Sequence, residues 1–451
     1  DGLKRLEYRG YDSAGVALVK DGDIQRVRRE GKLKALSDAV QKSPIDGLQG
    51  IAHTRWATHG VPNEVNAHPH TSGHNVAIVH NGIIENHDEL RHELTSGGFE
   101  FASDTDTEVI AHRIRFYLNE GSNVLEAVQS TVSELRGAYA LVVMVADDPD
   151  ALVLARSGGP VVIGLGEEEN FVASDIAALL PVTRRFQFLE DGDVALVRRC
   201  SVEIYDAAGM PVDRPVVESE LTADSNDRGR YRHYMEKEIH EQGRAVAATL
   251  EDRIGDGKLL DNIMGPEAGE VMPKVECVHI VACGTSYHAG LVARYQLEEL
   301  AGIPCMVDIA SEYRYRRPVV PENSLFVAIS QSGETADTLA ALRIAKEFGY
   351  LGTLAICNVP ECSLVRESDF VLMTRAGPEI GVASTKAFTT QLTALALLTV
   401  ALGKARGMDA NTEYVLVDQL AELPSLVEQT LVLDEDIAEL SKKFSDKHHA
   451  L

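Results

Sequence analysis

Hydrophobic and polar positions follow two different patterns along the chain. In residues 14–28 and 138–205, short apolar runs are separated by turn signals such as Asp21-Gly22 and Asp191-Gly192, which indicates antiparallel sheet. From residue 275 onward, apolar strands alternate with helical segments. That alternation is typical of a parallel sheet with helices on both faces. The sequence therefore predicts an α+β part followed by an α/β part.

The first part also contains a block of helices. Strands are expected at 14–19, 24–28, 50–54 and 76–80, and helices at 88–96, 107–118 and 124–135. Thr105 and Glu108 have the spacing of a capping box in front of the second helix. Two stacked antiparallel sheets with helices outside would accommodate these elements.

The second part begins after a polar segment, residues 218–229, that has few large apolar residues and is interpreted as a linker. A helical stripe covers residues 231–254. Five buried parallel strands are then expected at 275–282, 305–309, 325–329, 353–357 and 370–373.

Hydroxyl-rich loops follow several of these strands. Ser330, Gln331, Ser332 and Thr335 come directly after strand 325–329, at the start of a helix. Ser and Thr in this position are helix caps in many proteins. However, similar turns occur at 283–286, which includes Thr285 and Ser286, and at 377–390, which includes Val382 and Ser384.

In a doubly wound sheet all three loops lie at the carboxyl edge, where helix N-termini favour anions. Together they predict a phosphate site. No GxxxxGK[ST] motif is present, so a small phosphorylated metabolite is favoured over a nucleoside triphosphate.

The first part offers three candidate polar groups. Arg55 adjoins Trp56, the only tryptophan, and a guanidinium fork there suits either a carboxylate ligand or a structural ion pair. Asn81-Gly82 could form an oxyanion hole, although a plain turn is the simpler interpretation of that pair alone. Asp106 lies in an acidic cluster whose role at a helix start could be to interact with the helix dipole.

Composition narrows the possibilities further. The 451 residues suggest about three domains, and the formal charge of -26 disfavours nucleic acid as a partner. No apolar run is expected to cross a membrane, since the nearest, residues 392–402, has the length of a core helix. Six cysteines without CxxC spacing suggest reduced core residues of a cytosolic protein. The histidines at 68, 70, 448 and 449 lack partners for a metal site.

Long motifs carry a family resemblance. RGYDSAG at 9–15, HTRWATHG at 53–60, NAHPH at 66–70, HNGIIEN at 80–86 and TDTEV at 105–109 resemble a type II glutamine amidotransferase domain. Together with CGTS at 283–286, SQSGETADT at 330–338 and EIGVASTKAFT at 379–389, they resemble the family of isomerizing glutamine-dependent fructose-6-phosphate aminotransferases.

The resemblance implies a fold of class α/β in two parts, an Ntn-hydrolase four-layer αββα sandwich and a flavodoxin-like three-layer αβα sugar isomerase (SIS) domain. The expected boundaries are residues 1–201 for the amidotransferase domain, 202–230 for a linker, 231–268 for a helical lead-in, 269–409 for the first SIS domain and 410–451 for a helical connection to a second SIS domain.

The resemblance also implies the reaction, in which L-glutamine and D-fructose 6-phosphate give L-glutamate and D-glucosamine 6-phosphate without a metal or organic cofactor. In the first domain it implies that Arg55, Thr58, His59 and Asp106 bind glutamine, that Trp56 gates an ammonia channel, and that Asn81 and Gly82 form the oxyanion hole. The resemblance also implies a cytoplasmic homodimer. In the second domain it implies that the sugar phosphate is bound by the following residues: Thr285, Ser286, Ser330, Gln331, Ser332, Thr335, Val382 and Ser384.

Two departures from the family pattern bear on activity. The nucleophile of such amidotransferases is an amino-terminal cysteine, and residue 1 here is Asp1. The second SIS domain would follow Leu451. The sequence as given is therefore expected to be a fragment that turns over neither substrate.

Two alternative functions remain open from the sequence. A non-catalytic sugar-phosphate sensor would use the same loops but would not need the amidotransferase motifs. A phosphoribosyl-diphosphate amidotransferase would share the first domain but would need an acidic diphosphate loop, which residues 330–335 do not provide.

Overall fold

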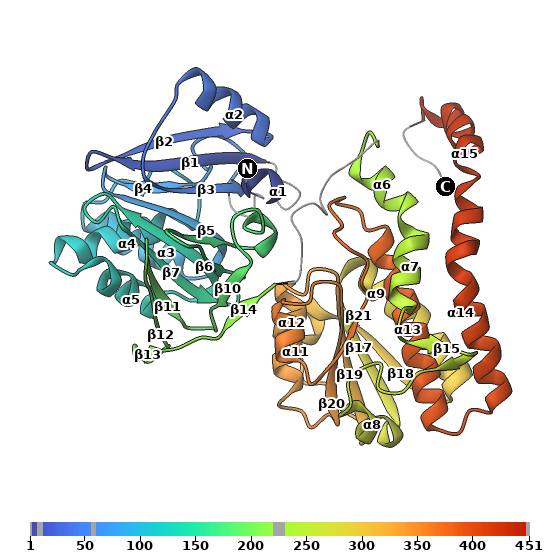
Figure 1. The fold of residues 1–451 in the computed structure, drawn as a ribbon. Helices are drawn as coiled ribbons and strands as arrows, with labels where there is room; N and C mark the ends of the chain where they lie inside the picture. The colour runs from blue at the N-terminus through green and yellow to red at the C-terminus, as the bar shows by residue number, and fades with distance from the viewer. Residues whose placement is uncertain (1, 7–11, 56–59, 220–230, 448–451) are drawn as a thin grey trace. The chain divides into compact units, whose positions relative to one another are not determined.

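The computed structural model describes residues 2–6, 12–55, 60–219 and 231–447. The chain divides into two compact units, residues 1–224 and 225–451. Figure 1 draws the helices and strands of both units, and each unit has its own hydrophobic core.

The centre of the first unit is a seven-stranded sheet in which the neighbouring strands with resolved pairing are antiparallel. Its central strands are apolar on both faces because both faces are covered: β6 is buried at seven consecutive positions from Tyr139 to Val145. In sheet order the strands are β13 (Pro211–Val212), β12 (Val202–Tyr205), β11 (Val194–Arg198), β7 (Ala151–Ser157), β6 (Gly137–Val145), β5 (Val76–Ile84) and β4 (His70–Ser72).

One face of this sheet is covered by helices. Leu90, Ile110, Ile114 and Val128, which come from three helices, form a core with alternate residues of β5, β6 and β7. Figure 1 shows these helices together on one side of the sheet. They are α3 (His87–Ser96), α4 (Glu108–Asn119) and α5 (Val124–Glu134).

The other face packs on a second layer of strands. A three-stranded sheet has the order β2 (Asp23–Glu30), β1 (Ser13–Lys20), β3 (Gln49–Arg55), and a four-stranded sheet has the order β14 (Val216–Glu218), β10 (Arg185–Phe188), β8 (Val162–Leu165), β9 (Asn170–Ala173). The helix α2 (Leu33–Lys42) covers β1 and β2 through Leu33 and Leu36. The short α1 (Gly2–Leu6) and the 3₁₀ helix η2 (Ile176–Ala178) adjoin this layer. The four-layer αββα arrangement predicted from the resemblance is confirmed.

Four details of the first unit differ from the sequence prediction. The second sheet layer is two sheets, because the chain enters it in two separate stretches. The capping box predicted at Thr105 and Glu108 is wrong, since the N-cap of α4 is Thr107 and makes no side-chain cap; the box is at Asn123 and Glu126 of α5. The strand expected at 76–80 continues to Ile84. Residues 202–218 of the expected linker contain strands β12, β13 and β14, which pair within the sheets of this unit.

The second unit contains the predicted parallel sheet. Its order is β18 (Cys305–Ile309), β17 (Cys277–Ala282), β19 (Ser324–Ser330), β20 (Gly352–Cys357), β21 (Phe370–Met373), and all four pairings are parallel. The first two strands are in reverse order relative to the chain, as in a flavodoxin-like sheet, so a switch point lies at the carboxyl ends of β17 and β19.

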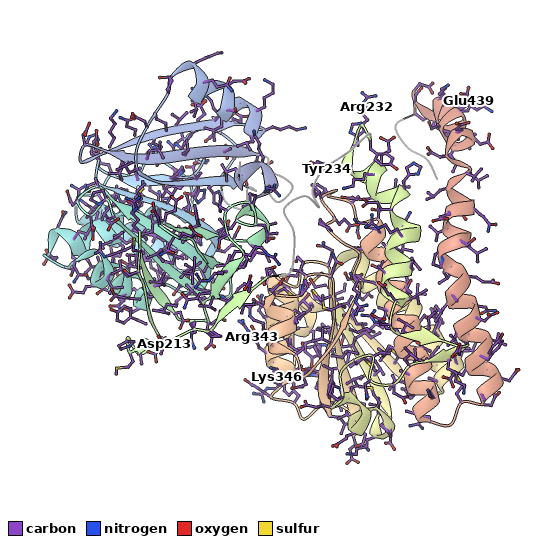
Figure 2. The ribbon with its side chains drawn as sticks, viewed as in Figure 1. Asp213, Arg232, Tyr234, Arg343, Lys346 and Glu439 are labelled. Carbon is purple, nitrogen blue, oxygen red and sulfur yellow. The ribbon has the colours of Figure 1, made fainter. Side chains whose placement is uncertain are left out.

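Helices cover both faces of this sheet. On one face, α9 (Gly284–Gln296), the π-helix η5 (Leu297–Ala301) and α13 (Lys386–Ala405) pack on β17, β19 and β20. On the other face lie α10 (Ala310–Tyr313), α11 (Ala336–Ala345) and α12 (Ser363–Glu367). Arg343 of α11, labelled in Figure 2, ties α11 to α12 through two 2.8 Å hydrogen bonds to Glu367.

The remaining elements of the unit precede β17 or follow α13 in the chain. The helix expected over 231–254 is divided into α6 (Tyr234–His240) and α7 (Gln242–Leu250), and Ile254 belongs to a two-stranded hairpin. Val246 and Leu250 pack with Leu397 and Val417, so α7, α13 and α14 share a small core. The other elements are β15 (Ile254–Gly255), β16 (Lys258–Leu259), α8 (Ala268–Val271), η4 (Met272–Lys274), α14 (Ala410–Leu431), α15 (Asp434–Ser441) and η6 (Lys442–Phe444).

The apolar helix α13 is longer than its sequence pattern suggested. By length and composition alone it could cross a membrane, in contrast to the expectation from sequence that no segment would. However, 72% of its most apolar window is buried inside the unit, between the sheet and α7. Burial within the protein accounts for its apolar composition.

Candidate active site and sugar-phosphate loop

A cavity of about 880 Å³ in the first unit brings together the predicted glutamine-binding residues. Arg55 from the end of β3, Asn81 and Gly82 from β5, and Asp106 from the loop before α4 all line it. These residues come from three separate segments of the chain, so the fold, and not local sequence, assembles them. Trp56, Thr58 and His59, also predicted to belong to this site, lie outside the described residues.

Arg55 is buried, with 4% of its surface exposed. Its Nη2 donates to the Gly60 carbonyl at 3.3 Å. Burial lowers the pKa of Arg55, while the negative charges of Asp106 and Asp12 raise it. A partly desolvated guanidinium at a cavity wall is well placed to bind a carboxylate, because the interaction is stronger where water is excluded.

Asn81 and Gly82 lie inside a strand, so the alternative interpretation as a plain turn is wrong. They pair with Ala140 and Tyr139 of β6. Gly82 has φ of +138°, and a Cβ added there would lie 2.0 Å from the Ala138 carbonyl oxygen. Only glycine fits, because a side chain at this position would clash with the backbone of β6.

Asp106 is fixed from the same strand. Its Oδ2 accepts a hydrogen bond from the Ile84 N–H at 2.8 Å. The carboxylate is 4% exposed and contributes a negative charge to the wall that also holds Arg55. A positive and a negative group on one wall match the two charged ends of an α-amino acid.

Buried histidines also line this cavity, and the sequence prediction did not include them. His53 Nε2 is 2.8 Å from Asn81 Oδ1, and the His53 ring stacks on His68 at 4.3 Å between centroids. Thr107 Oγ1 bridges His68 Nε2 at 3.2 Å and His80 Nδ1 at 2.9 Å. The signal was present in the histidines of NAHPH and HNGIIEN, but nothing in spacing shows that they meet.

These histidines are uncharged at neutral pH. Burial lowers the pKa of His53 to about 4 and that of His70 to about 3, and it lowers the pKa values of His68 and His80 as well. A neutral imidazole has one N–H and one lone pair. The cluster can therefore orient polar groups through hydrogen bonds without placing positive charge beside the cavity.

An anchored carboxylate supports the loop that carries Asp106. Glu108 accepts from the Ala102 N–H at 3.0 Å, from the Ser103 N–H at 2.6 Å and from Ser103 Oγ at 2.7 Å. Burial raises the pKa of Glu108, but hydrogen bonds from His112, Ala102 and Ser103 outweigh burial and lower it to about 2. Glu108 thus stays ionised and fixes residues 102–108.

In the second unit, the predicted phosphate loop forms a compact turn after β19. Ser330 Oγ accepts from the Gly333 N–H at 3.0 Å and lies 3.1 Å from Thr335 Oγ1. Ser332 Oγ accepts from the Glu334 N–H at 3.2 Å. Thr335 is the N-cap of α11 but makes no side-chain cap. The simple capping role for this hydroxyl is therefore wrong.

The other two hydroxyl turns have different environments. The parallel register pairs Ala282 with Ile329, so the turn with Thr285 and Ser286 leaves the sheet beside the loop at Ser330. Thr285 is exposed and Ser286 is buried in α9. In the third turn, Val382 is 68% exposed and Ser384 Oγ donates to Glu379 Oε2 at 3.1 Å. Gln331 is half-buried.

The third turn is held by two carboxylates. Glu379 accepts from the Thr385 N–H at 2.9 Å and the Ala387 N–H at 3.0 Å. Glu238 of α6 accepts from the Ile380 N–H at 2.5 Å and the Gly381 N–H at 2.9 Å. Within the described residues no group of three or more His, Cys, Asp or Glu side chains is arranged to hold a metal ion.

Comparisons with known proteins agree with both halves of this arrangement. A glutamine amidotransferase domain model matches residues 53–181, and an SIS domain model matches residues 274–401. An amidotransferase domain joined to an SIS domain defines a class of glutamine-dependent enzymes.

The particular family follows from closely similar proteins. The chain is 58% identical, over its whole length and 74% of the relative, to glutamine–fructose-6-phosphate aminotransferase (isomerizing) of Escherichia coli K12. It is 57% identical, with the same coverage, to the protein of that name from Yersinia pseudotuberculosis. The C-terminal domain of glucosamine-fructose-6-phosphate aminotransferase from Francisella tularensis is 50% identical over 49% of this chain and 63% of that one, with a TM-score of 0.48. This chain belongs to the glutamine–fructose-6-phosphate aminotransferase (isomerizing) family.

Proposed function

We propose that this protein uses glutamine as the nitrogen donor for converting fructose 6-phosphate to glucosamine 6-phosphate, with ammonia released in the first unit and used in the second. The observation that carries the glutamine half is the convergence of Arg55, Asp106, Asn81 and Gly82 on one cavity. The 58% identity over the full chain supports this function over the phosphoribosyl-diphosphate amidotransferase and sensor alternatives.

Each residue at the cavity has a distinct role in this proposal. Arg55 binds the α-carboxylate of glutamine and Asp106 its α-ammonium group, which places the side-chain amide toward β5. The Asn81 side-chain amide and the Gly82 N–H then stabilise the oxyanion that develops on the carbonyl oxygen of the glutamine side chain. No cysteine lies among the described residues that line the cavity, so these residues bind and polarise glutamine but do not supply the nucleophile. That the 451-residue chain turns over neither substrate stays a prediction, which a glutaminase assay would check.

The sugar-phosphate half of the proposal rests on the loop after β19. The hydroxyls of Ser330, Ser332 and Thr335 and the side chain of Gln331 lie at the carboxyl edge of the sheet and the N-terminus of α11, where backbone N–H groups favour an anion. Thr285, Ser286, Val382 and Ser384 contact the sugar in this proposal. A homodimer in the cytoplasm, without nucleic acid or membrane partners, is proposed as well, and sedimentation velocity would test the dimer.

Two binding titrations on the same chain test the two halves separately. Arg55→Ala is expected to abolish detectable glutamine binding by calorimetry, whereas Arg136→Ala, an exposed arginine paired only loosely with Glu89 at 3.9 Å, serves as its control. Ser330→Ala combined with Thr335→Ala is expected to weaken fructose 6-phosphate binding at least about tenfold, since two hydrogen bonds to a charged group are lost. Ser425→Ala on α14 is the matched control.

Unchanged glutamine affinity in Arg55→Ala would remove the first site assignment. Unchanged sugar-phosphate affinity in the double variant would remove the second. Binding of phosphoribosyl diphosphate in preference to fructose 6-phosphate would favour the alternative enzyme.

A further inference from the structure

Two buried cysteines touch beneath the sugar-phosphate loop. Cys357 ends β20 and Cys362 precedes α12, and their Sγ atoms are 3.4 Å apart. Both are reduced, and they are 0% and 3% exposed. The intervening residues 358–361 form a tight connection, so the two side chains are held against each other by the local backbone.

The pair is packed directly against residues 330–335. A Cβ added to Gly333 would lie 2.0 Å from Cys362 Sγ and 2.8 Å from Cys357 Sγ, so the loop backbone rests on both sulfur atoms. The Cys357 thiol donates to the Gln331 carbonyl at 3.7 Å. A displacement of either sulfur atom therefore requires the backbone of residues 330–335 to move at Gly333.

Backbone hydrogen bonds join the two segments on either side of this contact. The Leu364 N–H donates to the Gly333 carbonyl at 3.1 Å, and the Ser363 N–H donates to Glu334 Oε1 at 2.7 Å. The start of α12, immediately after Cys362, is therefore tied to the loop at two further points. A displacement of Cys362 is transmitted to Gly333 and Glu334.

We propose that Cys357 and Cys362 are a redox modification site: oxidation to a disulfide rearranges residues 330–335 and weakens sugar-phosphate binding. This inference rests on the proposed role of that loop. It adds a chemical control that the substrate-binding residues alone do not provide. The pair is distinct from Cys200, which is exposed and has no thiol partner among the described residues.

The oxidant in this proposal is a peroxide, and the reaction has two steps. The thiolate of one cysteine attacks a peroxide oxygen, which breaks the O–O bond and gives a sulfenic acid and water. The second thiol then attacks the sulfenic sulfur, forms the S–S bond and releases a second water. Two thiols and one hydrogen peroxide therefore give one disulfide and two waters, and a dithiol reductant reverses the change.

The geometry explains why the bond would disturb the loop. Bond formation brings the sulfurs from van der Waals contact to about 2.05 Å. It also removes the S–H group that lies 3.7 Å from the Gln331 carbonyl oxygen. Because interiors are closely packed, Gly333 must follow the sulfur on which it rests. The hydroxyls of Ser330 and Thr335 then lose the arrangement that the Gly333 N–H helps to fix.

Burial sets the rate of the reaction and predicts protection by ligand. The Cys357 thiol and burial both raise the pKa of Cys362 well above its ordinary value. Little thiolate is present while the loop is closed, so oxidation proceeds when the loop opens. A sugar phosphate that holds the loop closed should therefore slow the oxidation.

The first test measures the disulfide itself. The reduced 451-residue chain is exposed to hydrogen peroxide, alkylated, and digested with trypsin, which cleaves after Lys346 and Arg366 and so releases both cysteines in one peptide. The expected product is this peptide without alkylation and about 2 Da lighter, from the loss of two hydrogens. Fructose 6-phosphate present during exposure should reduce its yield. Oxidation of Cys200 alone would overturn the proposal.

The second test measures fructose 6-phosphate affinity by calorimetry before oxidation, after oxidation and after reduction with dithiothreitol. The expected change is a reversible loss on the order of tenfold, about the value of one hydrogen bond to a charged group. Cys362→Ser, which places a favourable residue at the N-cap of α12, should bind equally under all three conditions, and Cys200→Ser should respond like the parent chain. A disulfide in the peptide with unchanged affinity would overturn the proposal. If the reduced chain does not bind fructose 6-phosphate, the proposed function of residues 330–335 is wrong, and the proposed redox regulation is wrong with it.

Discussion

His53 donates a hydrogen bond from Nε2 to the side-chain oxygen of Asn81 across 2.8 Å. An amide oxygen only accepts, so the Nε2 atom carries the proton. The bond fixes the orientation of the amide, and the Asn81 NH₂ group is the part left for the cavity. A histidine outside the predicted site thus determines which end of Asn81 faces the cavity.

The lowered pKa values of the cavity histidines predict acid sensitivity. Because the folded-state pKa of His53 is about 4, below its ordinary value near 6.5, the unfolded chain binds more protons between these values. The stability of the fold with respect to this group is therefore greatest above pH 6.5. As pH falls from 6.5 toward 4, His53 lowers the free energy of unfolding by about 1.4 kcal/mol per pH unit. Urea unfolding at pH 5, 6 and 7 would measure the slope.

His53→Gln isolates one histidine from the others. Between pH 5 and 6.5, the slope of its unfolding free energy against pH should correspond to about one proton fewer taken up on unfolding than in the parent chain. Some slope should remain, because His68, His70, His80 and His279 also have lowered pKa values. An identical slope in the two proteins would show that His53 does not titrate in this range.

Glycine at position 82 is expected to be indispensable for the first unit. Gly82→Ala places a Cβ against the Ala138 carbonyl and forces a φ of +138° on alanine. The expected loss of unfolding free energy is about 3 kcal/mol or more. Gly98→Ala is the matched control, because its φ is +89° but nothing lies within 4 Å of the added Cβ. Its cost should be about 1 kcal/mol. Equal costs in denaturant titrations would show that β5 and β6 separate to admit the methyl group.

The carboxylate of Glu108 predicts a second, more acidic transition. Its pKa of about 2 lies below the ordinary value of 4.5, so its stabilisation is present above pH 4.5 and is lost as pH falls toward 2. Glu108→Gln should lower the free energy of unfolding at pH 7 by about 2–3 kcal/mol. Below pH 4.5, its unfolding free energy should also depend less on pH, by the equivalent of about one proton. Glu93→Gln, at an exposed carboxylate, should do neither. A Glu108→Gln protein as stable as the parent at pH 7 would contradict the assignment.

Glu238 is predicted to act as a hydrogen-bond acceptor and not through its charge. Burial raises its pKa, while the Gly381 and Ile380 N–H groups lower it. Glu238→Ala leaves both N–H groups without this partner, at a cost of about 3 kcal/mol, whereas Glu238→Gln should cost about 1 kcal/mol because an acceptor oxygen remains. Glu422→Ala, at an exposed carboxylate of α14, should change stability by less than about 0.5 kcal/mol. Thermal or urea unfolding of the four proteins would decide, and equal losses for the Ala and Gln variants at 238 would contradict the acceptor role.

Local sequence signals predicted the elements better than their assembly. The Asp21-Gly22 turn does join β1 to β2, and the five apolar runs after residue 275 do form a parallel sheet. In contrast, the pairing of β1 with β3 and the division of the second layer depend on contacts between distant segments. Spacing alone also suggested the wrong capping box, because Glu108 finds its partners upstream at Ala102 and Ser103.

The candidate sites show the same division. Arg55, Asn81, Gly82 and Asp106 were identified from sequence, and the structure brings them to one cavity. His53 and Thr107 were not, because a buried histidine has no distinctive sequence pattern until its partners are known. The contact between Cys357 and Cys362 was likewise hidden, since cysteines five residues apart carry no recognised spacing.

The parallel sheet of the second unit has a further consequence for how such proteins diversify. Its strands are joined through backbone groups that every amino acid has, and their buried side chains face helices and not ligand. Apart from Ser330, which pairs with Cys357, the three hydroxyl turns lie beyond the paired residues, so replacing the rest of a turn leaves the hydrogen-bond ladder intact. Grafting new turns after Ala282, Ser330 and Met373 is therefore a practical route for engineering a scaffold that accepts other phosphorylated small molecules.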